Sequence, residues 1–548
     1  MVARSASDNR HYPSSPVKFI PFIVSNRTNA LYSLVFSTII MLLGYSGLLL
    51  RRHYSTDSYH LIDNQQAYWY LQNGRYTWWQ VTMWLDQHGI NLVLDQRPLL
   101  VLAIISFTLS LTLLTLVFSY VAGLTMPLQV MSVNMVLSLL FINVFVEEFM
   151  LFPEVAVSAA IGFLFVTIAA TFLLKSSRWQ YAIGSFVCLM LALGCYQSLI
   201  GYYLAIVLVG GALKTPTIAN DKKVKSVILR WIETIAIAGI AGIANIVIVK
   251  MLIKASVIID PGRGATTNVH TMLANIIIIL KYQFKLWWNA DGLMAPGSMI
   301  ILLCIVIIGI VMAIRLHVSL NVTELLFAAA LSYAASFAVH VLERDIQLTP
   351  RSNMAFWAVQ GILLATLICS LFTKHNLRQE QPVPLDKDNS NGAGSQIITN
   401  NNARSMFVFI SAIGIFVFGV TLNMQDISYD LYTSNSLDKD YALNVAAKIH
   451  DYEKETGISV KKIAIKEDTK PQQKYRSTRY YNNQLGRRIM NVDYANYQMI
   501  NYLGRLQMEK IDFPSKIYKE YFNQKNWEVE DLDQQLIIKG DTAYLMLY

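Results

Sequence analysis

Hydrophobic residues along this chain fall in repeated long runs that are separated by short polar segments. A run of about 20 apolar residues can cross a bilayer as a helix, because each residue adds about 1.5 Å. The pattern predicts eleven spans, at 31–50, 98–122, 128–149, 156–174, 180–196, 199–213, 226–250, 297–314, 320–342, 353–373 and 406–423. It therefore predicts a mainly α-helical, polytopic membrane protein.

Composition excludes several other classes of protein. The chain has 548 residues, of which 54% are hydrophobic and 15% are charged, so it is too apolar for a soluble enzyme. The net charge of +9 does not indicate a nucleic-acid partner, because the cations gather in short connections between predicted spans. The cysteines all lie inside predicted spans, which indicates packing residues and neither a disulfide framework nor a zinc site. They are Cys188, Cys195, Cys304 and Cys369.

The cations also predict the orientation in the membrane. Connections that share a side with the N-terminus carry Arg4, Arg10, Lys18, Arg27, Lys175, Arg178, Lys214, Lys222, Lys223, Lys225, Arg230, Arg315, Lys374 and Arg378. The cation-rich side is normally cytoplasmic, so we expect the N-terminus inside and, after an odd number of spans, the C-terminus outside. Arg51 and Arg52 oppose this orientation, but two residues do not outweigh the pattern.

Three parts are expected along the chain. Residues 1–28 are polar and basic, with no apolar stretch that ends in a cleavage site, and predict a cytoplasmic tail and not a signal peptide. Residues 29–423 form the transmembrane domain, which includes an outer loop at 51–97 and a polar, flexible linker at 375–405. Residues 424–548 are less apolar and predict a small extracytoplasmic α/β domain.

Local patterns predict the elements of that last domain. Residues 441–455 and 493–507 have the periodicity of amphipathic helices, and 460–465 reads as a strand. Residues 535–548 predict a hairpin with its turn at 539–541. In the preceding domain, residues 272–280 are too short to span the membrane and indicate a helix at the outer interface.

The outer loop at 51–97 is longer than most connections and combines carboxylates with tryptophans. These residues are Asp57, Asp63, Asp86 and Asp95, and Trp69, Trp78, Trp79 and Trp84. Carboxylates accept protons or sugar hydroxyls, and flat indole faces stack on sugar rings. Tryptophans at the lipid headgroup layer would give the same composition, so both interpretations stay open.

Ionisable residues also collect at the predicted outer ends of the later spans. They are Glu147, Glu148, Lys281, Lys285, Asp291, His340, Glu343, Arg344, Asp345 and Arg351. Charges near hydrocarbon are costly unless they are paired or bind a ligand. Arginines bind phosphates bidentately and a carboxylate deprotonates a hydroxyl, so the set suits transfer from a phosphate-linked donor.

Simpler interpretations of these ionisable residues remain. Glu343 would pair with Arg344, and the two consecutive glutamates would cap a helix. Arg351 follows Pro350 at a span end and needs an anionic partner, either Glu343 or Asp345 or a lipid phosphate. Gln197, beside Tyr196, either bonds between helices or contacts substrate.

Four short motifs resemble a known family. They are Ser55–His60 (STDSYH) after the first span, Asn73-Gly74-Arg75-Tyr76, Tyr196-Gln197-Ser198 and Pro350-Arg351. Over residues 30–375 the chain resembles membrane glycosyltransferases of the GT-C superfamily, and among them the O-antigen-modifying glucosyltransferase family of serotype-converting phages. The family often has paired acidic residues in the first loop. Here Asp57 stands alone between Thr56 and Ser58, which leaves the second role to Asp63, Glu147 or Glu148.

The resemblance implies a GT-C-like fold and a bacterial enzyme of the plasma membrane. The donor would be a polyprenyl-phosphate-linked sugar, usually glucose, and the acceptor a cell-surface polysaccharide or a teichoic-acid-like glycan on the outer face. Membrane lipid would surround the protein, and no nucleic acid would bind. The leaving lipid phosphate requires no metal, so no cofactor and no metal ligands are expected, although a divalent metal is compatible with the reaction.

The candidate site residues follow from these arguments. Asp57 is the expected general base, and Glu147 and Glu148 are the other candidate catalytic residues. The candidate substrate-binding residues are Asp63, Arg75, Trp78, Tyr196, Gln197, Lys281, Lys285, Arg344 and Arg351. The main alternative is a transporter or flippase of lipid-linked glycans. Pairs of spans broken by Pro or Gly in matching halves of the chain would indicate that class. A membrane scaffold is a third, and it leaves the acidic and aromatic loop unexplained.

Overall fold

The computed structural model describes residues 19–62, 67–176, 178–214, 221–260, 265–266, 268–318, 320–379, 392–467, 488–523 and 531–547. Before residue 380 it contains α1 (Phe19–Ser25), α2 (Arg27–Leu50), α3 (Ser58–Ile62), α4 (Ala67–Gln72), α5 (Tyr76–Gln87), α6 (Gln96–Ala122), α7 (Pro127–Leu137), η1 (Ser138–Leu140), α8 (Val144–Met150), α9 (Pro153–Lys175), α10 (Trp179–Leu193), α11 (Leu199–Leu204), η2 (Ala205–Val209), η3 (Ala212–Lys214), α12 (Asp221–Lys254), α13 (Val269–Asn289), α14 (Ser298–Arg315), α15 (Val322–Ala335), α16 (Ala338–Val341), η4 (Pro350–Asn353) and α17 (Ala355–Gln379).

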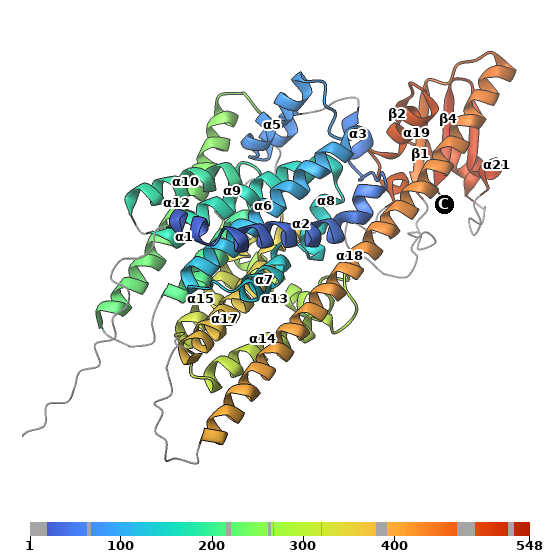
Figure 1. The fold of residues 1–548 in the computed structure, drawn as a ribbon. Helices are drawn as coiled ribbons and strands as arrows, with labels where there is room; N and C mark the ends of the chain where they lie inside the picture. The colour runs from blue at the N-terminus through green and yellow to red at the C-terminus, as the bar shows by residue number, and fades with distance from the viewer. Residues whose placement is uncertain are drawn as a thin grey trace, which may run out of the picture.

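After residue 391 the order is α18 (Gly392–Thr456), β1 (Lys462–Glu467), η6 (Ile489–Asn491), α19 (Asn496–Gly504), β2 (Glu509–Ile511), α20 (Ser515–Ile517), η7 (Tyr518–Phe522), α21 (Leu532–Gln535), β3 (Leu536–Lys539) and β4 (Thr542–Leu547). The long helices form a bundle, and the small sheet lies beyond one end of it (Figure 1).

Apolar helices confirm that this chain has the character of a membrane protein. Among the described residues seven helices are long and apolar enough to cross a bilayer, or eight if α7 with η1 and α8 form one bent span. Three shorter apolar helices, Trp179–Leu193, Leu199–Lys214 and Val322–Ala335, coincide with the other predicted spans. Each predicted span therefore falls on helical structure, while the count of eleven stays a prediction.

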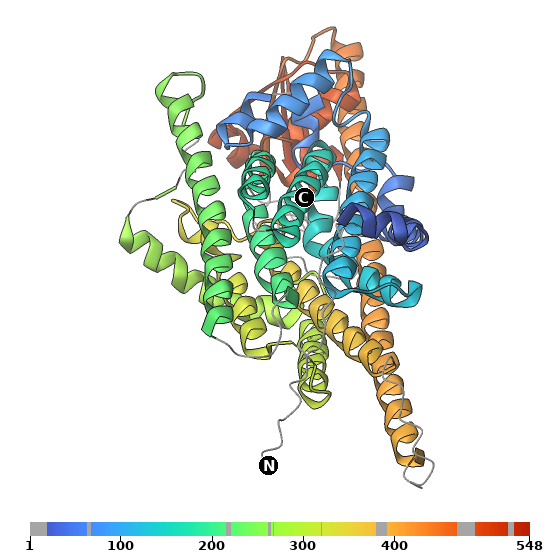
Figure 2. The ribbon, with the colours of Figure 1, turned by 60° about the vertical axis from the view of Figure 1, so that its left-hand side comes forward.

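Successive helices run between two ends of the bundle. At one end, which we call the basic end, the Lys175 Nζ lies 5.8 Å from the Phe19 ring centroid and Thr373 Oγ1 donates to Ala122 O at 3.0 Å. The Lys214 Nζ donates to Leu173 O at 3.3 Å at the same end. The opposite end carries α3, α4, α5 and the C-terminal sheet (Figure 2). We call it the site end.

The C-terminal sheet has the strand order β2-β1-β4-β3. β1 is parallel to both β2 and β4, and β3 is antiparallel to β4. The predicted hairpin is confirmed: β3 and β4 pair, and Gly540 adopts a φ of 60° in the turn, where a side chain would be strained. The predicted strand is confirmed two residues later than expected, and α19 confirms the second helix.

The predicted domain boundary at residue 424 does not coincide with a break in the chain. α18 is a single helix of 65 residues that runs through this position from the bundle into the C-terminal domain. The polar linker at 375–405 is also shorter than predicted, because α17 extends to Gln379 and α18 begins at Gly392. Residues 1–18 and 380–391 lie outside the described residues.

The core of the C-terminal domain includes side chains from the outer loop. Tyr59, Leu61 and Ile62 of α3 and Val93 pack in one buried cluster with C-terminal residues such as Ile449. Burying these side chains stabilises the pair of segments by roughly 25 cal/mol for each Å² of apolar surface removed from water. The loop and the C-terminal domain therefore form one packed unit.

A buried ion pair also holds this unit together. The Arg488 Nε donates to Asp438 Oδ1 at 2.6 Å, and Asp438 Oδ2 accepts from the backbone of Ile489 at 2.8 Å. Asp438 lies on α18, so the pair ties the helix to the turn before α19.

We predict that Asp438→Ala destabilises the C-terminal domain by about 3–5 kcal/mol, because it leaves the buried guanidinium without its carboxylate. Limited proteolysis of the purified chain and its thermal unfolding measure this loss. Asp533→Ala is the matched control, since its ion pair with Lys448 is exposed and is worth at most about 1 kcal/mol. Equal losses in the two variants would contradict the prediction.

Candidate functional site

A break between α7 and α8 sets the geometry of the site end. The two helices are bent by 65°, and the Asn143 side chain caps α8 by accepting from the backbone of Phe145 and Val146 at 3.1 and 3.0 Å. This cap satisfies N–H groups that would otherwise be buried without partners. Two residues separate the end of α8 from Pro153, which starts α9. Glu147 and Glu148 of α8 and Glu154 in the first turn of α9 therefore lie close together at the site end.

Glu147 and Glu148 face different neighbours, because consecutive residues of a helix point about 100° apart. Both are buried. Glu147 Oε1 accepts from Ser428 Oγ of α18 at 3.0 Å. Glu148 accepts two bonds from Arg351, from its backbone N at 2.6 Å and from Nη1 at 3.0 Å. The structure therefore connects Glu147 to α18, and Glu148 to the arginine that the sequence singled out.

A second pair of carboxylates is formed by Asp57, before α3, and Glu154, in the first turn of α9. Glu154, which is buried, accepts hydrogen bonds from Ser55 Oγ and from Ser58 Oγ, the latter at 3.0 Å. Ser55 Oγ also accepts from the backbone N of Asp57 at 3.0 Å, so the serine that bonds to Glu154 also holds the Asp57 backbone. The two serines of the STDS sequence thus hold Asp57 against Glu154.

Glu154 was not among the predicted site residues. A carboxylate in the first turn of a helix is common because it interacts favourably with the helix dipole. This structural role was enough to explain Glu154, so its sequence position did not indicate a functional role. The signal that was available is the spacing: Glu154 follows the helix-breaking Phe152-Pro153 step, at the same predicted outer end as Asp57.

Arg75 lies in an aromatic site without a carboxylate partner. Its guanidinium carbon is 4.9 Å from the Tyr196 ring centroid and 5.7 Å from that of Trp69. Its buried Nε has no hydrogen-bond partner, and no carboxylate lies within ion-pair distance of Arg75, among the residues that the structure describes. Burial lowers the pKa of this guanidinium, and the nearby Arg351 lowers it further.

The backbone around Arg75 is fixed by two amide side chains. Gln197 Nε2 donates to Asn73 O at 2.7 Å, and Asn245 Nδ2 of α12 donates to Gly74 O at 3.3 Å. Gly74 has a φ of 73°, and a Cβ there would meet the Gln197 side chain at 2.9 Å. Gln197 therefore holds the Asn-Gly-Arg turn of the outer loop, and this bond is not the bond between helices that the sequence offered as the alternative to a substrate contact.

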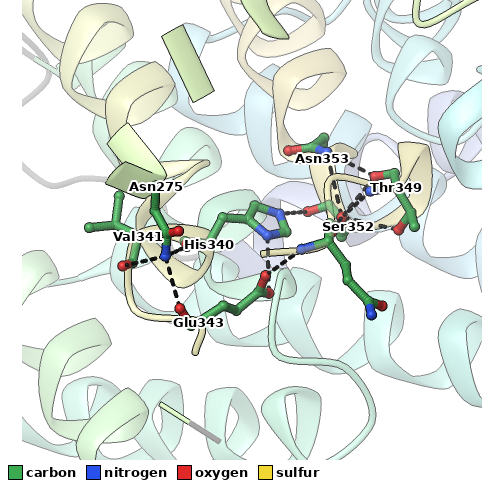
Figure 3. Close-up of polar contacts among 8 residues, drawn as sticks. Asn275, His340, Val341, Glu343, Thr349, Ser352 and Asn353 are labelled. Atoms are coloured by element: carbon green, nitrogen blue, oxygen red, sulfur yellow. Dashed lines mark hydrogen bonds and ion pairs between the residues drawn. The ribbon is translucent and has the colours of Figure 1, made fainter. Parts of the chain in front are cut away.

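A polar network joins residues 340–343 to the turn before α17, which contains Arg351 (Figure 3). His340 lies between two partners: its Nδ1 is 3.0 Å from Glu343 Oε1 and its Nε2 is 3.3 Å from Ser352 O. Asn275 of α13 donates to three carbonyls of this turn, including Glu343 O at 2.8 Å. The Arg351 guanidinium carbon lies 4.6 Å from the Phe152 ring centroid.

These contacts correct two simpler interpretations. Glu343 pairs with His340, so the predicted Glu343–Arg344 pair is wrong. Glu343 and Asp345 are likewise not the carboxylates that meet Arg351, because its side chain pairs with Glu148 from a different helix. Sequence distance explains the error, since Glu148 lies 203 positions before Arg351.

The remaining predicted substrate-binding residues do not converge on this centre. Trp78 is fully buried and packs edge-on against Tyr70, with 5.5 Å between ring centroids. Lys281, Lys285 and Arg344 are exposed, and no ion pair involves them within the described ranges. Asp63 lies outside the described residues.

The combined arrangement is a carboxylate pair beside two arginines. Arg75 and Arg351 both lie near enough to Asp57 and Tyr196 to interact with them electrostatically. The four charged groups come from the start of α3, the start of α9, the turn before α5 and η4. Within the described part of the chain, no group of three His, Cys, Asp or Glu residues could hold a metal ion. Such a site can accept a proton and bind an anion side by side.

The C-terminal domain reaches this centre as well. Tyr494 Oη donates to Asp57 Oδ1 at 2.5 Å, and Gln498 Nε2 is 2.9 Å from His60 Nδ1. Neither contact could be predicted from the sequence, because both depend on how α19 packs on α3.

Comparison with known proteins identifies the family of the chain. No curated protein matches the chain at a significant level. A family model described as Glucosyl transferase GtrII matches residues 47–365, which is more than half of the chain. The matched range contains Asp57, Arg75, Glu154 and Arg351 and ends before α18. The resemblance drawn from the short motifs is thus confirmed, and the chain belongs to the GtrII glucosyl transferase family.

Proposed function

We propose that this glucosyl transferase is a GT-C type enzyme that moves glucose from a polyprenyl-phosphate donor to a cell-surface glycan, such as a polysaccharide or a teichoic-acid-like polymer. The observation that carries the proposal is Arg75, a cation at the site end without a carboxylate partner among the described residues. A cation in such a site is costly unless an anion joins it. A lipid phosphate next to Arg75 and Arg351 supplies that anion.

The four charged groups divide the reaction between them. Asp57 accepts the proton of an acceptor hydroxyl, whose oxygen bonds to the anomeric carbon as the bond from that carbon to the phosphate oxygen breaks. Arg75 and Arg351 stabilise the charge that remains on the lipid phosphate. Glu154, bonded to Ser55 and Ser58, holds the backbone of the Asp57 turn. A single displacement of this kind inverts the anomeric configuration.

We propose no resident cofactor. The two arginines carry the positive charge that a divalent metal supplies in other transfers from phosphate donors. Lys281, Lys285 and Arg344 are exposed and would meet the headgroup layer of the surrounding lipid.

The transporter and flippase alternative is not favoured, because the family to which the chain belongs is named for glucosyl transfer. A scaffold role likewise does not explain why Arg75, which has no carboxylate partner among the described residues, lies near Asp57 and Glu154.

We propose a bacterial plasma membrane location with the basic end in the cytoplasm and the site end outside. The basic end carries Arg27, Lys175, Lys214 and Arg315 on helix termini. Arg230 lies within α12 and pairs with Glu324 in the first turn of α15. A cluster of cations on short connections favours the cytoplasmic side. The glycan acceptor would then reach Asp57 from outside the cell.

Cysteine labelling tests this orientation. In a variant whose four native cysteines are replaced by alanine, Ser436→Cys at the site end should react with a membrane-impermeant thiol reagent on intact cells. Ser226→Cys, at the start of α12, should react only after the cells are opened. Both positions are exposed in the structure. The reverse pattern would place the reaction in the cytoplasm.

We predict that Asp57→Asn lowers glucosyl transfer by a factor of about 10² to 10⁴, because the amide cannot accept the proton. Glycan analysis of cells, and transfer by the purified enzyme, measure the loss. Asp86→Asn is the control, since Asp86 is an exposed carboxylate of the same loop. Transfer near the wild-type rate by folded Asp57→Asn would exclude Asp57 as the base and direct attention to Glu154.

Substitutions of Arg75 and Arg351 should differ in their effects on donor binding and on the stability of the protein. Arg75→Gln removes a cation without a carboxylate partner, so the KM for the donor should rise at least tenfold while thermal stability is kept or increases. Arg351→Gln leaves buried Glu148 without its partner, so stability should fall together with activity. Donor titration and thermal unfolding of both purified variants measure this. A loss of stability in Arg75→Gln with an unchanged KM would make Arg75 a structural residue.

A further inference from the structure

The turn before α19 brings a tyrosine of the C-terminal domain onto the proposed catalytic base. Tyr494 Oη donates to Asp57 Oδ1 at 2.5 Å, across 437 positions of sequence. The Tyr494 ring meets the His60 ring edge-on, with 6.2 Å between ring centroids. Asp57 lies within residues 47–365, the range that the family model matches, whereas Tyr494 lies in the part of the chain that the model does not match.

The surrounding contacts fix where α19 lies. Gln498 Nε2 is 2.9 Å from His60 Nδ1, and the Tyr502 ring lies 5.9 Å from that of Tyr59. Met499 and Ile500 of α19 are fully buried in the core that the domain shares with α3. The helix is therefore anchored, whereas the Tyr494 side chain, which is 47% exposed, lies at its edge and can turn away from Asp57.

The bond to Asp57 conflicts with the role of Asp57 as a base. A general base must lie within hydrogen-bond distance of the hydroxyl that it deprotonates. The Tyr494 hydroxyl already occupies a hydrogen-bonding position on Asp57 Oδ1, which the acceptor hydroxyl would need. Burial raises the pKa of the Tyr494 phenol above its usual range, and the negative charge of Asp57 adds to this, so Tyr494 remains the protonated partner.

We propose that the Tyr494 hydroxyl occupies the position of the acceptor hydroxyl on Asp57, so that the C-terminal domain selects the nucleophile. This proposal rests on the proposed function. Without a glycan, Tyr494 holds Asp57 and prevents it from activating water. A glycan that binds between α3 and the turn before α19 displaces the Tyr494 side chain and presents its own hydroxyl to Asp57.

The reaction that Tyr494 suppresses is hydrolysis of the donor. In hydrolysis Asp57 accepts a proton from water, the water oxygen bonds to the anomeric carbon, and the bond to the phosphate oxygen breaks. The products are free glucose and the lipid phosphate. The same base serves both nucleophiles, so selection depends on which hydroxyl can reach Asp57.

Tyr494→Phe tests the proposal in the full-length enzyme, because it removes the hydroxyl and keeps the ring. With a short-chain prenyl-phosphate glucose as donor and no acceptor, release of free glucose should rise about tenfold or more, in line with the loss of one hydrogen bond to a charged group. Transfer to surface polysaccharide purified from cells that lack this protein should stay within about twofold of wild type at saturating acceptor. Tyr502→Phe, on the same helix but in contact with Tyr59, is the matched control and should change neither rate.

The other outcomes overturn the proposal in distinguishable ways. If hydrolysis and transfer fall together in Tyr494→Phe, Tyr494 orients Asp57 for the reaction and does not block access of water to it. If hydrolysis is unchanged, the contact has no part in nucleophile selection. If wild-type enzyme neither hydrolyses this donor nor transfers from it, the proposed donor is wrong, and that failure is seen in wild type and not in the variant.

A second measurement does not depend on activity. Fluorotyrosine incorporated into the protein gives a ¹⁹F resonance for Tyr494, which Tyr494→Phe identifies by its disappearance. Adding the purified polysaccharide without donor should shift this resonance, because the side chain leaves Asp57. A resonance that does not move while the polysaccharide supports transfer would overturn the proposal.

Discussion

The site end of this enzyme depends on the pairing of one buried charge. Glu148 lies on a short helix between two spans, and it accepts both the backbone and the side chain of Arg351. An unpaired carboxylate there would cost several kcal/mol, so the pair fixes α8 against the turn before α17. That contact joins the early and late halves of the bundle. Arg75 then lies beside an arginine whose charge is already matched, and its own charge remains available for an anion.

Aromatic side chains partly stabilise the charge of Arg75. The Arg75 guanidinium lies near the faces of Trp69 and Tyr196, and such contacts stabilise a cation by about 0.5–2 kcal/mol. This is less than a carboxylate would contribute, so the phosphate of the proposed donor would still gain affinity from Arg75. The arginine is held in place by the Asn-Gly-Arg turn, which Gln197 and Asn245 fix through the backbone. Binding therefore does not have to order the side chain first.

Sequence reasoning identified what depends on local composition. Apolar runs predicted the helices, the turn signal at 539–541 predicted the hairpin, and the short motifs around Asp57, Arg75 and Arg351 predicted the family. It missed Glu154 as a site residue, because a carboxylate at a helix start already has a structural explanation. It also missed the ion pair between Glu148 and Arg351, because the two residues are far apart in sequence. It also placed a domain boundary where composition changes, although α18 continues through that position because a helix can remain helical while its surroundings change from lipid to protein.

The continuity of α18 has a consequence for the C-terminal domain. A separate domain on a flexible linker would reach Asp57 only at an effective concentration set by that linker. Here the helix is rigid, and Asn435 of α18 accepts from the backbone of Tyr54 at 2.6 Å, close to the STDS turn. The shared core of α3 and α19 fixes the other side. These contacts hold the domain against the outer loop, while the Tyr494 side chain at its edge is half-exposed. The proposed selection between water and glycan would then require the rotation of one side chain, and no domain would have to move.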